Sequence, residues 1–142
     1  MLAKDDIINK EIELPAVMDN FNGFMNFIES NLTIAGVGKI IADKITTASE
    51  EIITNIINYA YSASGGSLKI DFNYKPGRIT VIFIDEGARF NPLDSPDVNV
   101  ALPLEKREAG GLGIFLAKNL MDGMSYEYKE GKNHLSLVKF IS

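Results

Sequence analysis

At 142 residues, with 46% hydrophobic and 23% charged residues, the chain has the length and composition of one globular domain over residues 1–142. It contains no cysteine and one histidine, His134, which excludes disulfides, cysteine nucleophiles and metal sites built from thiolates or several histidines. The formal net charge of −5 and the scattered basic residues argue against a nucleic-acid surface, although backbone N–H groups at a glycine turn could still bind one small anion.

The chain begins with the patterns of a strand and an amphipathic helix. Residues 7–14 have a strand pattern, and Pro15 suits the first turn of a following helix because its missing N–H needs no partner there. The helix is indicated by apolar residues at spacings of three and four: Val17, Phe21, Phe24 and Ile28. The two glycines within residues 35–38 are expected to end it.

A longer helix is predicted from about Lys39 to Tyr61. Its apolar stripe consists of Ile41, Ile45, Ala48, Ile52 and Ile56. At about 100° per residue, Glu51 and Asn55 fall together on one shoulder of this stripe. A carboxylate there is partly desolvated, which costs free energy unless it has a partner. Taken alone, the pair is explained as an acid that reaches water and an amide that bonds nearby backbone.

Four further strands and one more helix are predicted in the rest of the chain. The strands are residues 68–74, 78–85, 124–129 and 133–142, with turns at Pro76-Gly77 and Glu130-Gly131. The second of them has apolar residues on both faces, as expected of a central strand, and the helix covers residues 114–122. This order predicts an α/β sandwich, with a mostly antiparallel sheet of about five strands and helices on one face.

Two glycine-containing motifs enclose a long irregular segment. Asp85 ends a strand, and Gly87 after it would allow something to approach the backbone closely. Residues 86–113 lack periodicity, and so long a loop in a small domain is more often functional than accidental. Gly111 and Gly113 precede a helix, where free N–H groups at the positive end of the helix dipole favour a phosphate. Each motif alone is commonly only a turn or a packing feature.

Together the three motifs are far more specific. The order E-x-x-x-N, D-x-G, G-G-x-G, with a long loop between the last two, resembles the nucleotide-binding Bergerat fold of the gyrase, histidine kinase and MutL ATPase superfamily. Closer still, residues 49–61, 85–93 and 103–122 look like the anti-sigma-factor serine kinases of bacterial partner-switching systems. The resemblance covers nearly the whole chain, including the last strand, where relatives usually have threonine in place of Ser136.

The resemblance implies a role for each motif residue. Glu51 would be the general base that takes the proton from an attacking hydroxyl, and Asn55 would ligate Mg²⁺. Asp85 would accept a hydrogen bond from the adenine amino group of ATP, with Gly87 making room for the ring. The other implied ATP contacts are Gly111 and Gly113 at the triphosphate, Arg107 at a phosphate, and the Ser136 hydroxyl at adenine.

The segment from about Asn91 to Ala109 would be the mobile ATP lid. The sequence departs from the family at two places. Tyr59 stands where sporulation-type relatives often have histidine, and the residues after Gly87 lack a second glycine found in many superfamily members. These departures bear on substrate identity and lid geometry rather than on ATP binding.

The expected function is that of a cytoplasmic, Mg-ATP-dependent protein serine/threonine kinase acting as an anti-sigma factor. The resemblance implies that it phosphorylates a STAS-type anti-sigma-factor antagonist, sequesters a partner such as a sigma factor, and forms a homodimer. A cytoplasmic location without membrane contact is also expected because the amino terminus lacks the apolar run of a signal peptide and no apolar segment approaches a membrane span.

Two other functions compete with this one. In the first, the chain is a nucleotide-gated binding module: ATP orders the lid, the lid changes a protein-binding surface, and little or no phosphoryl transfer occurs. In the second, it is the ATPase half of a histidine kinase. This is disfavoured because the chain has no helical dimerisation segment with a phospho-accepting histidine, and His134 lies in a predicted strand. Type II topoisomerase and mismatch-repair ATPases fit poorly because their additional domains are missing.

Overall fold

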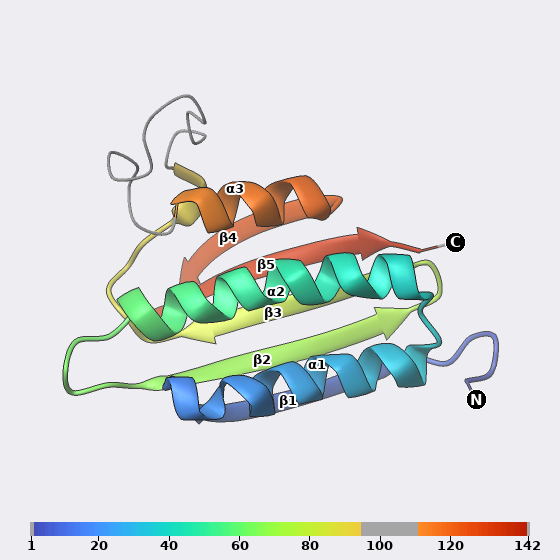
Figure 1. The fold of residues 1–142 in the computed structure, drawn as a ribbon, viewed down its shortest axis with the longest axis horizontal. Helices are drawn as coiled ribbons and strands as arrows, with labels where there is room; N and C mark the ends of the chain where they lie inside the picture. Colours follow the sequence, from blue (N-terminus) through green and yellow to red (C-terminus); the bar gives the residue numbers. More distant parts are fainter. Residues whose placement is uncertain (1, 95–110, 142) are drawn as a thin grey trace.

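The computed structural model describes residues 2–94 and 111–141, and the order of its elements is the predicted one (Figure 1). The strands are β1 (Ile8–Pro15), β2 (Ser67–Lys75), β3 (Arg78–Asp85), β4 (Gly123–Lys129) and β5 (Lys132–Phe140). The helices are α1 (Phe21–Ala35), α2 (Lys39–Tyr59) and α3 (Gly111–Leu120), with short 3₁₀ turns η1 (Met18–Asn20) and η2 (Pro92–Asp94).

The strands form one sheet in the order β1-β2-β3-β5-β4, and all four pairings are antiparallel. Strand β5 lies between β3 and β4 in the sheet, although it follows β4 in the sequence. The connection from β3 to β4 therefore leaves a space in the sheet that β5 fills. The three helices lie on one face of the sheet (Figure 1). The structure therefore confirms the predicted α/β sandwich, with β3 as its central strand.

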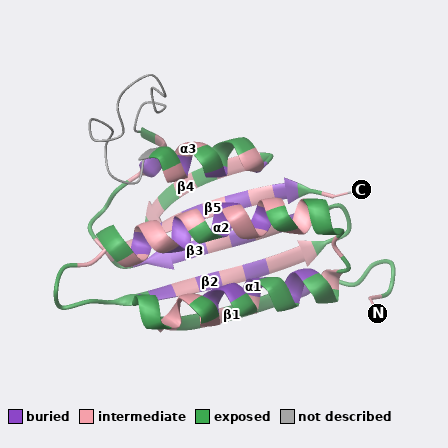
Figure 2. Ribbon diagram, in the orientation of Figure 1, coloured by how far each residue is buried: buried purple, intermediate pink, exposed green. Residues whose placement is uncertain are grey.

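The hydrophobic core fills the space between the helices and this face (Figure 2). Its largest fully buried side chains include Phe24 from α1, Ile45 and Ile52 from α2, and Phe72 and Phe83 from the sheet. Burying one such side chain stabilises the fold by roughly 1.5–3 kcal/mol. The predicted apolar stripe of α2 is confirmed as the helix's buried side, apart from partly buried Ile41.

The structure corrects the expected start of the first helix. Pro15 does not begin a helix but is the last residue of β1, opposite Ser67. Val17 has an extended backbone and is 44% exposed, and α1 begins only at Phe21. Pairing with β2 extends to Pro15, and the N–H of Ala16 donates to the carbonyl of Gly66. These contacts with β2 outweigh the local preference of proline for a helix start.

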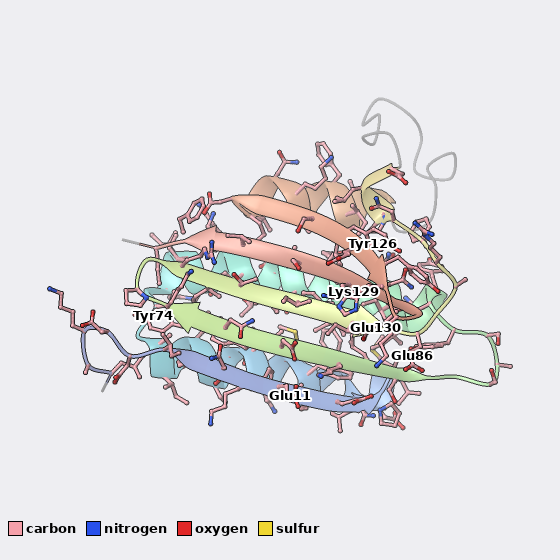
Figure 3. The ribbon with its side chains drawn as sticks, turned by 180° about the vertical axis from the view of Figure 1, so that it is seen from behind. Glu11, Tyr74, Glu86, Tyr126, Lys129 and Glu130 are labelled. Atoms are coloured by element: carbon pink, nitrogen blue, oxygen red, sulfur yellow. The ribbon has the colours of Figure 1, made fainter. Side chains whose placement is uncertain are left out.

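No helix of the described residues covers the other face of the sheet (Figure 3). On this face Asp71 lies opposite Glu11 and Ile82, and its Oδ1 is buried without a hydrogen-bond partner among the described residues.

None of the helices in the described residues is long and apolar enough to span a membrane.

We expect Asp71→Asn to stabilise the protein at pH 7. Burial raises the pKa of the Asp71 carboxyl, and the nearby Lys69 ammonium opposes this only in part. The folded state therefore binds this proton more tightly than the unfolded chain, so the charged carboxylate costs stability at neutral pH. That cost disappears as pH falls below the ordinary pKa of 3.8. Denaturant unfolding should give Asp71→Asn a higher free energy of unfolding than the natural protein at pH 7. Near pH 3.8 the two proteins should have nearly equal free energies of unfolding. A less stable variant at pH 7 would mean that attraction to Lys69 outweighs desolvation.

Candidate functional site

Four parts of the chain meet at one end of the sheet, on the left in Figure 1: the end of β3, the carboxyl-terminal half of α2, the first turn of α3 and the β4–β5 turn. Helix α2 packs against both α3 and β3. The salt bridge between Lys132 and Glu86, 3.6 Å long, joins the β4–β5 turn to the residue that follows β3. Figure 3 shows Glu86 beside this turn.

Glu51 lies on α2 with its carboxylate over the first turn of α3. A Cβ atom added to Gly113 would stand 2.5 Å from Oε2 of Glu51, so only glycine leaves room for the carboxylate at this point. Asn55 follows one turn later, and both side chains are partly exposed beside the buried Ile52 and Ile56. The structure thus brings together the first and third sequence motifs and confirms the boundary position of the Glu51-Asn55 pair.

Gly113→Ala tests this contact. The added methyl group would displace the end of the Glu51 side chain, which is flexible, so the fold should survive. Within a helix, replacing glycine by alanine changes stability by up to about 1 kcal/mol in alanine's favour. We expect an unchanged or raised melting temperature, while a reaction in which the Glu51 carboxylate takes part should slow by about 10²-fold, the cost typical of a 1 Å misplacement of a reacting group. An unchanged reaction rate in this variant would show that the position of Glu51 over the turn is unimportant.

Asp85, the last residue of β3, is 7% exposed and forms the base of a tight loop. Its Oδ1 accepts hydrogen bonds from the backbone N–H of Gly87 and from Nδ2 of Asn133, both at 2.9 Å. Both donors converge on Oδ1, and Oδ2 receives no hydrogen bond from the described residues. A carboxylate oxygen held in this way is available to accept a hydrogen bond from a ligand.

Gly87 is required by the close approach of this loop to α2. A Cβ atom at Gly87 would stand 2.2 Å from the carbonyl oxygen of Ala60, just after the end of the helix. The sequence analysis assigned Gly87 to a contact with the adenine ring, whereas its tightest neighbour in the structure is the carbonyl of Ala60, the residue that caps α2. Helix α2 and its capping residue therefore touch both motifs, Gly113 through Glu51 and Gly87 through Ala60, at points roughly 14 Å apart along the helix axis.

Three buried or partly buried polar residues that the sequence analysis missed hold the 85–90 loop in place. Tyr61 donates its hydroxyl to the carbonyl of Ser67 at 2.6 Å and accepts the N–H of Glu86 at 2.7 Å. Burial raises the pKa of the Tyr61 phenol above its ordinary value of 10.0, so the hydroxyl keeps its proton to a higher pH than an exposed tyrosine does. Asn133 and Tyr126 hold the loop from the opposite side. One signal was present in the sequence, since Asn133 shares its strand face with Leu135 and Leu137.

The structure does not bring Ser136 to this cluster. Asp85 lies directly opposite Asn133, so the two residues share the helix-covered face of the sheet. Ser136 is opposite Ile82 and lies three residues beyond Asn133, which places it on the uncovered face. Helix α3 begins at Gly111 and not after Gly113, so the two glycines that were expected to precede the helix lie in its first turn. Arg107 lies outside the described residues, as does most of the predicted lid from Asn91 to Ala109. Only the first part of the lid is described, and it contains η2.

Among the described residues no group of three or more histidine, aspartate or glutamate side chains could hold a metal ion. A metal at this site would therefore need ligands other than a cage of protein carboxylates.

Near the 85–90 loop, the Arg89 guanidinium lies 4.9 Å from the centre of the Tyr128 ring. This cation–π contact connects the loop to β4.

The chain is similar to known proteins over most of its length. Residues 14–139 match the family model of the histidine kinase-like ATPase domain. The serine-protein kinase RsbW of Bacillus cereus is 30% identical over 120 residues, covering 78% of this chain and 74% of that protein. The serine/threonine-protein kinase BtrW of Bordetella bronchiseptica is 24% identical over 95 residues, covering 66% of this chain and 67% of that protein.

The fold is also shared with a solved structure. In the crystal structure of the RsbU and RsbW domains of Rv1364c from Mycobacterium tuberculosis, the match has a TM-score of 0.66 at 14% identity. It covers 94% of this chain and 32% of that longer chain. With the three motifs gathered at one end of such a fold, the chain belongs to the histidine kinase-like ATPase domain family and, within it, to the anti-sigma-factor serine kinases.

Proposed function

We propose that this protein is a Mg-ATP-dependent serine/threonine kinase that acts as an anti-sigma regulatory factor. The observation that carries the proposal is the placement of the Glu51 carboxylate over the first turn of α3, at the end of the sheet where Asp85 offers an oxygen to a ligand. The two contact points lie roughly 14 Å apart along the axis of α2, so a ligand that touches both motifs must be an extended molecule.

In this proposal the two ends of ATP are bound by different chemistry. Oδ2 of Asp85 accepts a hydrogen bond from the adenine amino group, which selects adenine over bases without a donor there. The free N–H groups of the first turn of α3, beginning at Gly111, lie at the positive end of the helix dipole and bind the triphosphate. The absence of a Cβ at Gly113 lets a carboxylate and a phosphate approach the same turn.

Glu51 is then the general base. Its carboxylate accepts the proton of a serine or threonine hydroxyl while that oxygen attacks the γ-phosphorus and the bond to the β-phosphate oxygen breaks. A Mg²⁺ ion would neutralise charge on the phosphates. Asn55 suits it, because Mg²⁺ commonly takes only one or two protein oxygens and completes its shell with phosphates and water. Ligation through Asn55 therefore agrees with the lack of a multi-carboxylate cluster among the described residues.

The family also guides the proposal for partners. We propose that the substrate is a STAS-type anti-sigma-factor antagonist, that a sigma factor is the alternative partner, and that the kinase works as a cytoplasmic homodimer. The supporting observations are the membership of the family, the names of the relatives as serine-protein kinases, and the lack of a membrane-spanning helix among the described residues.

The test is a transfer assay with γ-labelled ATP, Mg²⁺ and purified STAS-domain antagonists from the same genome. We expect one of them to acquire label on serine or threonine, and label to be absent when Mg²⁺ is chelated. If the protein binds ATP but labels no STAS antagonist, the substrate class is wrong, and the nucleotide-gated binding module becomes the better account.

A further inference from the structure

The 85–90 loop owes its shape largely to one buried side chain, that of Asn133. This residue is 6% exposed and stands at the start of β5, directly opposite Asp85. Its Nδ2 donates to Oδ1 of Asp85 at 2.9 Å, to the carbonyl of Ala88 at 3.1 Å and to the carbonyl of Gly87 at 3.3 Å. Two amide hydrogens thus serve three oxygens of the loop.

The other end of the amide is held just as firmly. Oδ1 of Asn133 accepts the backbone N–H of Phe90 at 3.1 Å and the hydroxyl of Tyr126 in a short hydrogen bond. The surroundings fix the orientation of the amide, because a flipped side chain would set its oxygen against three oxygens and its NH₂ group against an N–H. The amide therefore has a single hydrogen-bonded orientation, and the loop closes around it.

This arrangement determines which oxygen of Asp85 is left for a ligand. Asn133 and the N–H of Gly87 both occupy Oδ1, which prevents rotation of the carboxylate and keeps Oδ2 as the acceptor. A buried carboxylate without the Asn133 amide would lose one of its two charge-assisted bonds and be freer to turn. The loop carbonyls of Gly87 and Ala88 would at the same time lose their donor.

We propose that Asn133 is a positioning residue for base recognition: it holds Asp85 and the 85–90 loop so that Oδ2 presents to the 6-amino group of adenine. The inference rests on the proposed function, since it assigns Asn133 a part in the same nucleotide site. It differs from a purely structural role because it concerns the choice of base, not only the stability of the loop.

The test compares two nucleotides by calorimetric titration in the presence of Mg²⁺: ATP, and the analogue whose purine carries hydrogen in place of the 6-amino group. The natural protein should prefer ATP by about 10- to 100-fold, the factor that one hydrogen bond to a charged group supplies. In Asn133→Ala we expect the preference to fall to within about threefold, mainly through weaker ATP binding.

Two further variants make the result decisive. Asn133→Leu has nearly the same size and shape but cannot donate to Asp85, so it should also lose the preference, and it serves if Asn133→Ala does not fold. Asn31→Ala is the matched control, because Asn31 is equally buried at 6% but lies on α1 and donates to the carbonyl of Phe27. It should keep the full preference even if its stability falls.

The outcomes separate this inference from the proposed function. If the natural protein binds neither nucleotide, both fail. If Asp85→Asn loses the preference for ATP while Asn133→Ala and Asn133→Leu retain it, the nucleotide site stands and the role of Asn133 is overturned. An equal weakening of both nucleotides in the Asn133 variants would also overturn it, because it would show a structural effect without influence on the base.

Discussion

Replacing Glu51 by glutamine is expected to lower phosphoryl transfer by about 10²- to 10⁴-fold while ATP affinity stays within about threefold, the pattern of a lost general base. Glutamine has nearly the same shape and keeps an oxygen over the first turn of α3, where the Glu51 carboxylate now lies. It cannot accept the proton of the attacking hydroxyl. The measurement is initial-rate transfer of labelled phosphate to the antagonist, with ATP affinity determined separately by calorimetry.

Glu50→Gln is the matched control for this variant. Glu50 has the same charge and is the preceding residue of α2, but it is exposed on the outer side of the helix. It should transfer phosphate at the natural rate. A Glu51→Gln protein that still phosphorylates its partner would rule out the base assignment. If Glu51→Gln instead retains partner binding and signalling in cells, the nucleotide-gated binding module would explain the protein better than a kinase.

Gly87→Ala is expected to damage both the fold and nucleotide binding. The added Cβ would stand 2.2 Å from a backbone oxygen, that of Ala60, which cannot rotate away as a side chain can. Either the loop or the end of α2 must move, and overpacking of this kind typically costs about 1–3 kcal/mol. Because the moved loop carries Asp85, we expect ATP affinity to fall by about tenfold or more, which corresponds to at least about 1.4 kcal/mol.

Gly123→Ala provides the comparison. A Cβ at Gly123 would meet its nearest neighbour, Val138, at 3.5 Å, an ordinary van der Waals distance. This variant should therefore melt close to the natural protein and bind ATP with equal affinity. Unfolding curves and calorimetric titrations of the two variants measure both effects. Natural stability in Gly87→Ala would contradict the close packing of the loop on α2.

The elements of the fold could be predicted because their signals are local and strong. The boundary position of Glu51 and Asn55 followed from helical periodicity, and the Pro76-Gly77 turn from the conformational preferences of two residues. The start of α1 was wrong because Pro15 and Val17 follow their pairing with β2 and neighbouring backbone bonds, which the local sequence does not contain.

The candidate site was predicted only in part, for a similar reason. The motifs gave Glu51, Asp85 and the glycines, but the contact of Glu51 with Gly113 joins elements far apart in sequence. The contact of Asn133 with the 85–90 loop depends on the order of strands in the sheet. Only when β5 lies next to β3 can the first residues of β5 reach the loop. Ser136 lies away from the cluster because successive residues of a strand point to opposite faces of the sheet, and Ser136 is on the uncovered face. Which face a residue takes depends on the strand register rather than on the residue type.

Thermal unfolding with and without Mg-ATP, for the natural protein and for Asp85→Asn, tests the central claim most directly. A ligand that binds only the folded state must stabilise it, by about 2.7 kcal/mol at a concentration 100 times its Kd. Asn at position 85 can keep the Oδ1 acceptor but replaces Oδ2 by an NH₂ group, which cannot accept from adenine. We predict a clear rise in melting temperature for the natural protein that is lost in Asp85→Asn. No rise at saturating nucleotide in the natural protein would contradict the nucleotide site altogether.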